Sequence, residues 1–200
     1  MKTVVIASNN AHKIDEIRAA LDFEGWEFKS LREAQVDSDP EEDAATFEGN
    51  ARIKARAAHE LCGLAVLADD SGLEVDALDG APGVLSARYA GVHGDDAANN
   101  RKLLEELAGT PDEARTARFV CSLVFVDEDG SELAARGTVE GRIGHEERGS
   151  EGFGYDPLFL PDEFGGERTF AEVPQAEKTA ISHRGRALES LRAQLEERSR

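Results

Sequence analysis

The chain has 200 residues, of which 40% are hydrophobic, and a formal net charge of −18 at pH 7. This length and composition are typical of a globular protein with a substantial core, so we expect a single domain over residues 1–200. The negative charge argues against non-specific binding to nucleic acid and to anionic membranes, both of which need a basic surface. The sequence holds no run near the ~20 apolar residues of a membrane span and opens on strand-like residues where a signal peptide would stand. We therefore expect a cytoplasmic protein that binds neither nucleic acid nor membrane.

Hydrophobic periodicity predicts an α/β fold. Strands are predicted over residues 3–7, 27–31 and 64–68, and helices over residues 12–23, 44–62, 95–108 and 182–197. Residues 118–127 and 132–140 flank the turn Asp127-Glu128-Asp129-Gly130 and predict a hairpin. Early strands alternate with helices and a hairpin follows, so we expect a mixed sheet flanked by helices.

Two adjacent carboxylates, Asp69 and Asp70, follow the apolar run of residues 64–68, and Gly72 is expected to turn the chain directly after them. Active-site groups of open α/β sheets gather at such strand ends. Neighbouring carboxylates repel each other and lose hydration on burial, so a divalent cation or a raised pKa is the usual resolution. The alternative is an exposed turn in which one aspartate caps the next segment.

The first strand passes into a helix through Ser8-Asn9-Asn10-Ala11-His12-Lys13. A helix N-terminus with a lysine one turn further on suits a phosphate group. The alternative is an ordinary Ser or Asn helix cap. The turn lacks the Gly-Lys-Ser/Thr ending of a Walker A loop and the G-x-G-x-x-G of dinucleotide-binding folds, which excludes both motifs.

Three further polar segments are candidates for the same site. Glu41-Glu42-Asp43 precedes the helix that carries Lys54, where it either stabilises the helix N-terminus or contributes Glu42 to a metal site with Asp69 and Asp70. In Gly152-Phe153-Gly154-Tyr155-Asp156-Pro157, Phe153 could stack on a planar base; the alternative is a plain turn with a buried Phe. Lys178 to Gly185 supplies a Lys, a His and an Arg near the last helix, where the alternative is a Ser182 cap and a surface His183.

Six segments in this order resemble the family of non-canonical purine nucleoside triphosphate pyrophosphatases, the inosine and xanthosine triphosphatases. The resemblance covers nearly the whole chain. It rests on Ser8 to Lys13, Thr46 to Ala51 with Lys54, Ala68 to Gly72, Gly80 to Gly83 with Ser86 to Tyr89, Gly152 to Pro157, and Lys178 with Ser182 to Gly185. The chain departs from the family at Ser8 and Asn9, where members usually have Thr followed by Gly or Ser.

The resemblance implies an elongated mixed β-sheet flanked by helices, with two lobes around a central nucleotide cleft, and a homodimer. It also implies Mg²⁺-dependent hydrolysis of ITP, dITP and XTP between the α- and β-phosphates, which gives a nucleoside monophosphate and pyrophosphate. The related Maf-like pyrophosphatases, a nucleotide-binding regulatory module without turnover, and a purely structural acidic protein are the alternatives. Pyrophosphate release from a panel of nucleoside triphosphates separates them.

The resemblance also implies a role for each matched residue. Glu42 and Asp70 would bind the metal, and Asp70 would also activate the water. Whether Glu41 or Glu42 is the ligand, and whether Asp69 contacts the metal, stays open at this point. The triphosphate would be held by Ser8, Asn9, Asn10, Ala11, His12, Lys13 and Lys54, and the rest of the nucleotide by Ser71, Phe153, Gly154, Tyr155, Asp156, Lys178, His183 and Arg184.

Overall fold

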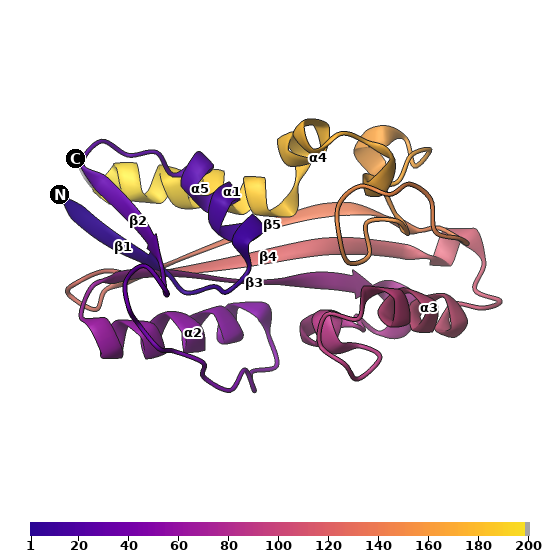
Figure 1. Ribbon diagram of the computed structural model, residues 1–200. Coiled ribbons are helices and arrows are strands. Elements are labelled where there is room, and N and C mark those ends of the chain that lie inside the picture. The colour runs from indigo at the N-terminus through magenta and orange to yellow at the C-terminus, as the bar shows by residue number, and fades with distance from the viewer. Residues whose placement is uncertain (199–200) are drawn as a thin grey trace. The chain divides into compact units, whose positions relative to one another are not determined.

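The computed structural model describes residues 1–198, except for the side chain of His12. Six strands form one sheet in the order β2-β1-β3-β4-β5-β6 (Figure 1). In chain order the elements are β1 (Lys2–Ile6), α1 (Ala11–Ala20), β2 (Trp26–Ser30), α2 (Phe47–Cys62), β3 (Ala65–Val75), α3 (Asp96–Glu106), β4 (Thr116–Val126), β5 (Glu132–Ile143), β6 (Phe159–Pro161), α4 (Gln175–Ile181) and α5 (His183–Arg198). Strand β1 is parallel to β2 and β3, and β6 is antiparallel to β5, which confirms the predicted mixed α/β sheet.

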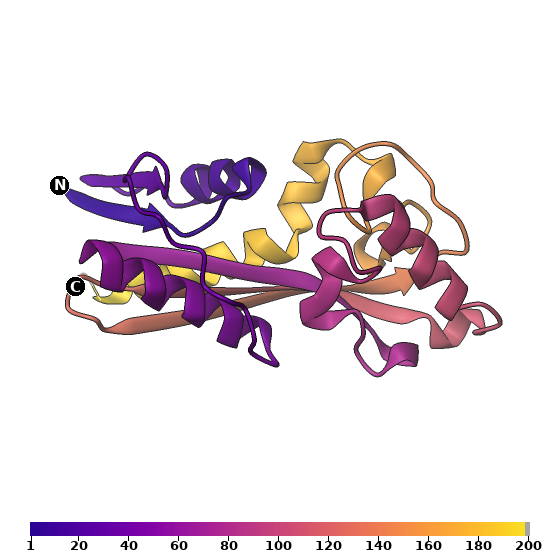
Figure 2. The ribbon, with the colours of Figure 1, turned by 60° about the horizontal axis from the view of Figure 1, so that its bottom comes forward.

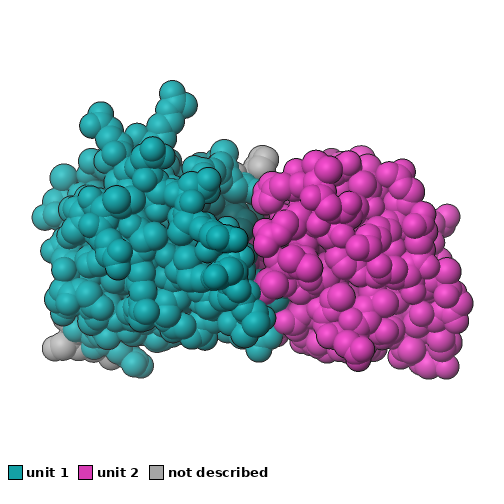
Figure 3. Space-filling model, turned by 90° about the horizontal axis from the view of Figure 1, so that it is seen from below, with its two compact units in different colours: residues 1–70, 121–137, 184–200 teal, residues 71–120, 138–183 magenta. Residues whose placement is uncertain are grey.

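The chain divides into two compact units, which Figure 3 colours separately. Unit 1 comprises residues 1–70 and 121–137 together with the described residues from 184 onwards, and unit 2 comprises residues 71–120 and 138–183. The single domain over residues 1–200 stays a prediction. No helix within residues 1–198 combines the length and the apolar character needed to cross a membrane.

In unit 1, helices cover both faces of the strands β1 and β3. Successive side chains of a strand point to opposite faces, so alternate residues of these strands pack against different helices. Val4, Ile6, Ala65 and Leu67 pack with α1 and α5, whereas Val5, Ala7, Val66 and Ala68 pack with α2. Figure 1 shows α1 and α5 on one side of these strands and α2 on the other, and Figure 2 shows β1 beside β2. Strands buried on both faces explain the nearly continuous apolar runs of the sequence.

Helix α2 begins later than predicted because a side chain caps it at Thr46. The Thr46 hydroxyl accepts a hydrogen bond from Gly49 N at 3.1 Å, which satisfies one of the free N–H groups of the first turn. The helix ends at Gly63, whose φ of +65° is the left-handed conformation that glycine adopts without strain. Residues 44–46 therefore belong to the loop before α2, which also contains Glu42.

The core of unit 2 is rich in aromatic side chains. Phe119, Phe159 and Phe170 lie in contact, with ring centroids 4.7 to 6.0 Å apart. The hairpin prediction is confirmed by β4 and β5, which the turn at residues 127–130 connects. Hydrophobic periodicity did not predict β6 and α4, which have only 3 and 7 residues, too few to show a hydrophobic period.

The predicted turn at Gly72 is wrong, because β3 continues through Asp69, Asp70 and Gly72 to Val75. A Cβ atom at position 72 would lie 2.3 Å from Ser86 Oγ and 2.8 Å from Gly83 O. Both partners belong to the 3₁₀ segment Gly83–Arg88, and Ser86 Oγ also accepts a hydrogen bond from Leu73 N at 2.9 Å. Glycine at this position therefore permits close packing of another segment against a continuing strand.

Candidate active site

The turn between β1 and α1 forms the predicted helix N-terminus. The Asn10 side chain caps α1 by accepting a hydrogen bond from Lys13 N at 3.3 Å, and Ser8 Oγ accepts one from Asn10 N at 3.2 Å. Asn9, Asn10 and Ala11 are exposed and Ser8 is half-buried. The turn therefore presents polar groups at the positive end of the α1 dipole.

Asp69 and Asp70 point to opposite faces of β3, because they are consecutive residues of one strand. Asp69 follows Ala65 and Leu67 on the face that α1 and α5 cover, and Asp70 follows Val66 and Ala68 on the face that α2 covers. The two aspartates consequently contact different charged side chains.

The Asp69 carboxylate is buried beside two basic side chains. Its Oδ2 lies 2.8 Å from Lys13 Nζ and 3.7 Å from Arg184 Nε. Although burial alone would raise the pKa of Asp69, the charges of Lys13, Arg184 and Lys54 hold it well below its usual range. At its other end the Arg184 guanidinium binds Glu16 at 2.6 Å. Asp69 is thus a buried anion that fixes Lys13 and Arg184 in place.

On the α2 face, Asp70 meets one amide and one ammonium group. Asn50 Nδ2 donates to Asp70 Oδ2 at 3.1 Å, and Asn50 Oδ1 accepts from Ala44 N at 3.0 Å, so Asn50 links Asp70 to the loop before α2. Lys54 Nζ lies 3.8 Å from Asp70 Oδ1 and 2.9 Å from Glu42 Oε2. Burial raises the pKa of Asp70, against the opposing effects of Lys54 and Asn50.

Glu42 and Asp70 lie beside the same ammonium group, that of Lys54, and are the two carboxylates of this region that could hold a metal ion. Two carboxylates fit Mg²⁺, which usually takes one or two protein carboxylates and completes its shell with water and substrate phosphate oxygens. No group of three or more His, Cys, Asp or Glu side chains among residues 1–198 is arranged to hold a metal without such outside ligands. Of the two glutamates left open by the sequence, Glu42 contacts Lys54 and Glu41 is exposed.

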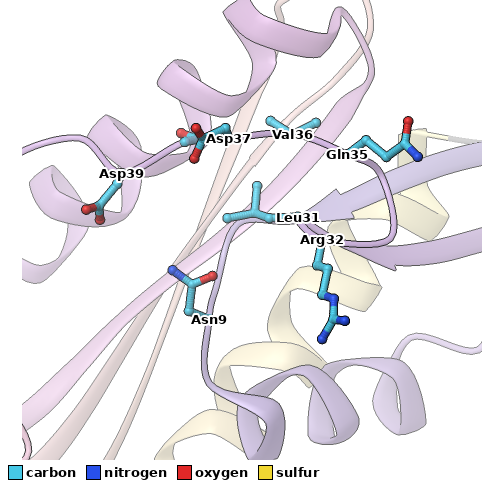
Figure 4. A pocket seen from close by; sticks show the side chains of 8 residues that line it. Asn9, Leu31, Arg32, Gln35, Val36, Asp37 and Asp39 are labelled. Carbon is cyan, nitrogen blue, oxygen red and sulfur yellow. The ribbon is translucent and has the colours of Figure 1, made fainter.

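A hollow of about 500 Å³ opens in unit 1 beside the first turn (Figure 4). Its lining combines the Asn9 amide, the Arg32 guanidinium and acidic side chains of the loop after β2. The lining residues are Asn9, Leu31, Arg32, Gln35, Val36, Asp37, Ser38 and Asp39. The side chain of Asn9, larger than the Gly or Ser that the resembled family usually has, therefore finds room in this hollow.

In unit 2, the segment Gly152–Asp156 forms a tight loop around the Asp156 carboxylate. Asp156 Oδ2 accepts from Phe153 N at 2.9 Å and pairs with Lys178 Nζ at 2.5 Å. A Cβ atom at position 152 would lie 2.0 Å from Asp156 Oδ2, and φ of Gly152 is +77°. The glycine therefore allows the backbone to close around the buried carboxylate.

Phe153 is 43% exposed, so the alternative of a plain turn with a buried Phe is wrong. Its ring centroid lies 4.9 Å from Lys178 Nζ, whose side chain is buried. The alternative of a surface His183 is also wrong, because this residue is 8% exposed and stacks on Phe119 with ring centroids 5.1 Å apart. Tyr155, two residues after Phe153 in the same loop, is buried and donates from its hydroxyl to Ser86 O at 2.9 Å.

Comparison with known proteins shows the family to which the chain belongs. The profile of the Ham1 family matches residues 4–194. The chain belongs to the Ham1 family. A relative from Exiguobacterium sibiricum named dITP/XTP pyrophosphatase is 52% identical over 192 residues, which cover 96% of each chain. One of the same name from Clostridium perfringens is 50% identical over 201 residues, covering 98% of each. The solved structure of the Staphylococcus aureus Ham1 protein has a TM-score of 0.90 and 42% identity, and covers 98% of this chain and 100% of that one.

In this Ham1-family chain, the predicted site residues lie in two clusters. The set in unit 1, called the phosphate cluster after its predicted role, comprises the first turn, Glu42, Lys54, Asp70 and Arg184. The set in unit 2, called the base cluster after its predicted role, comprises Phe153, Gly154, Tyr155, Asp156, Lys178 and His183. Ser71 follows Asp70 on β3 and is half-buried, and the His12 side chain lies outside the described part of the structure. The roles assigned to these residues stay predictions.

Two residues next to the phosphate cluster had no predicted role. Asn50 is buried between Asp70 and Ala44, and Glu16 binds Arg184. Asn50 could have been found from the sequence, because it lies in the quoted segment Thr46 to Ala51 one helical turn before Lys54. Glu16 could not have been found in this way, because its partner Arg184 is far away in the sequence.

Proposed function

We propose that this chain hydrolyses dITP, XTP and ITP to the nucleoside monophosphate and pyrophosphate. The observation that carries the proposal is a match over almost the full length to relatives named dITP/XTP pyrophosphatase, in a chain that brings Glu42, Lys54 and Asp70 together. The activity would remove non-canonical purines from the nucleotide pool.

The phosphate cluster supplies the positive charge that a triphosphate requires in a chain with a net charge of −18. The α1 N-terminus offers free N–H groups, and Lys13 and Lys54 offer ammonium groups whose positions Asp69 and Glu42 fix. Arg184 lies with Asp69 in this cluster and would add to the same field. These groups would hold the phosphate chain in line for displacement.

Glu42 and Asp70 would hold Mg²⁺, which when bound neutralises charge on the phosphate oxygens as the reaction proceeds. Asp70 would also take a proton from the attacking water while the bond between the α- and β-phosphates breaks. The hydrogen bond from Asn50 keeps the carboxylate in a fixed orientation.

In the base cluster, the exposed Phe153 ring would stack on the purine. Inosine and xanthine carry a keto oxygen at C6, which accepts a hydrogen bond from donors such as Lys178 or His183. Adenine would present an amino group to the same donor, and the unpaired contact costs roughly 1–3 kcal/mol, or about one to two decades in rate.

The test is hydrolysis of dITP, XTP, ITP, GTP and ATP with and without Mg²⁺, with identification of the products. We expect monophosphate and pyrophosphate from the first three substrates only when Mg²⁺ is present; diphosphate and phosphate would refute the proposed reaction. Asp70→Asn should keep nucleotide binding and lose most turnover, whereas Asp22→Asn, which removes one exposed carboxylate elsewhere in unit 1, should match the wild type. Near-normal turnover of Asp70→Asn would exclude Asp70 as the base.

We also propose that the chain forms a homodimer, as the family resemblance implies, and that it acts in the cytoplasm, as its charge and sequence patterns predict. Light scattering on the purified protein measures the first property. A mass of one chain over the working concentration range would refute it. Fractionation of the source cells measures the second property.

A further inference from the structure

Two side chains of α3, Asp96 and Asn100, bind both polar backbone groups of Gly154. Gly154 N donates to Asp96 Oδ2 at 2.7 Å, and Asn100 Nδ2 donates to Gly154 O at 3.1 Å. The two residues are four positions apart in the helix, so they lie on the same face, one turn above the other. Neither residue belongs to a segment to which the sequence analysis gave a role.

Gly154 is the residue after Phe153, and its conformation sets the direction in which the loop continues. Its φ is +63°, and within the described part of the chain no atom outside its two neighbours lies within 4 Å of where its Cβ would be. A glycine in open surroundings has the largest backbone freedom of any residue, so bonds from another element are needed to hold one conformation. Asp96 and Asn100 provide those bonds.

Phe153 is thereby held from both sides. Its own N–H donates to Asp156 Oδ2 at 2.9 Å, and the next residue is fixed by α3. The ring between these anchors is 43% exposed, so a large part of its surface is accessible to a ligand. The backbone contacts therefore fix the place from which an exposed ring is presented.

Asn100 has an energetic cost that its contact with Gly154 helps to offset. The residue is 2% exposed, and its Oδ1 has no hydrogen-bond partner among residues 1–198. A buried polar atom without a partner destabilises a fold, and an apolar side chain would also favour the helix more than Asn does. The bond from Nδ2 to Gly154 O is what an apolar side chain could not supply.

We infer that Asp96 and Asn100 are positioning residues for the purine base: they fix the Gly154 peptide groups so that Phe153 is presented in the orientation that stacks on the base. The inference rests on the proposed function, in which Phe153 is the stacking residue. Loss of either contact should weaken binding of ligands that carry a base. Binding of pyrophosphate, which carries none, should not change.

The test measures binding of inosine monophosphate and of pyrophosphate by titration calorimetry in the presence of Mg²⁺. Asp96→Ala and Asn100→Ala should each raise the Kd of inosine monophosphate by roughly tenfold, the equivalent of one hydrogen bond lost from the loop. The Kd of pyrophosphate should stay at the wild-type value. Asp96→Asn keeps an oxygen that can accept from Gly154 N and should stay close to the wild type.

Asp95→Ala is the matched control. Asp95 caps the same helix by accepting from Ala98 N at 3.0 Å, so its loss weakens α3 but leaves both contacts with Gly154. A rise in the Kd of inosine monophosphate in Asp95→Ala as large as in Asp96→Ala would overturn the inference, as would an equal rise for pyrophosphate in the two Gly154-contact variants. If Asp96→Ala does not fold, Asn100→Ala gives the same test.

Failure of the proposed function is a separate outcome. Wild-type protein that binds inosine monophosphate but releases no pyrophosphate from dITP would refute the proposed reaction. The role of Asp96 and Asn100 in base binding would still be decided by the Kd values.

Discussion

Replacing Asp69 by Asn should destabilise the protein far more than replacing its neighbour Asp70. Asp69 is buried, with 1% of its side chain exposed, and its Oδ2 lies 2.8 Å from Lys13 Nζ and 3.7 Å from Arg184 Nε. With an effective dielectric constant of ~20, these distances correspond to attractions of about 6 and 4.5 kcal/mol. Much of that is offset by the cost of removing the charges from water, so breaking such a buried pair costs about 3–5 kcal/mol.

The Asn side chain still accepts a hydrogen bond from Lys13, so we expect the lower end of this range, about 3 kcal/mol. For a chain of this size, each kcal/mol changes Tm by roughly 2–4 °C, so Asp69→Asn should melt about 6–12 °C below the wild type. The pKa of Asp69 lies below its usual range in the folded state. Its ionised form therefore stabilises the fold above the unfolded pKa, and this stability is lost as the pH falls through the folded pKa.

The contribution of Asp70 to stability changes with pH in the opposite direction. Burial raises the pKa of Asp70 above its usual value, so the folded state binds the proton more tightly and stability falls as the pH rises through that window. Asp70→Asn removes a charge that the fold disfavours, and at neutral pH it should be at least as stable as the wild type. Thermal and urea unfolding at pH 7 measure both variants. Equal stability of the two variants would refute the assignment of Asp69 as a structural anion.

Two further predictions concern unit 2. Gly72→Ala should lower the free energy of unfolding, measured by urea titration, by about 1–3 kcal/mol, because the new Cβ would lie 2.3 Å from Ser86 Oγ. Gly144→Ala is the control and should be tolerated in the same titration, because its Cβ would meet other atoms only at 3.5 Å or more. Lys178→Met should cost roughly 3–5 kcal/mol by removing the ammonium group that pairs with the buried Asp156 carboxylate, and adding Asp156→Asn should recover part of that loss. Strictly additive effects in this double-mutant cycle would mean that the pair has no coupling energy.

Local patterns predicted most of the elements of the fold. Val4, Val5 and Ile6 are consecutive apolar residues, as expected of a strand that helices cover on both faces. The polar turn at the start of α1 and the hairpin between β4 and β5 depend on neighbouring residues, and the structure contains both. Elements of 3 and 7 residues, β6 and α4, are shorter than the window from which periodicity is read, so they could not be predicted.

Several of the interactions in the two clusters depended on residues far apart in the sequence. Arg184 reaches Asp69 and Glu16 because α5 and α1 pack on the same face of the strands. Asp96 and Asn100 meet Gly154 because α3 packs beside a loop more than 50 residues later, as the separation of 54 between Asn100 and Gly154 shows. A pattern of neighbouring residues in the sequence cannot predict contacts between residues so far apart.

The adjacent aspartates show most clearly what the sequence determined and what it could not. The sequence by itself predicted a functional role for the segment Asp69-Asp70-Ser71-Gly72 and, by resemblance, favoured Asp70 over Asp69 as the metal ligand and base. Tertiary structure decided that the strand continues through Gly72, because Ser86 packs against the space left by its missing side chain. Continuation of the strand sends the two carboxylates to opposite faces, so that Asp69 is held as an anion by Lys13 and Arg184 while Asp70 faces Asn50 and Lys54 with a raised pKa.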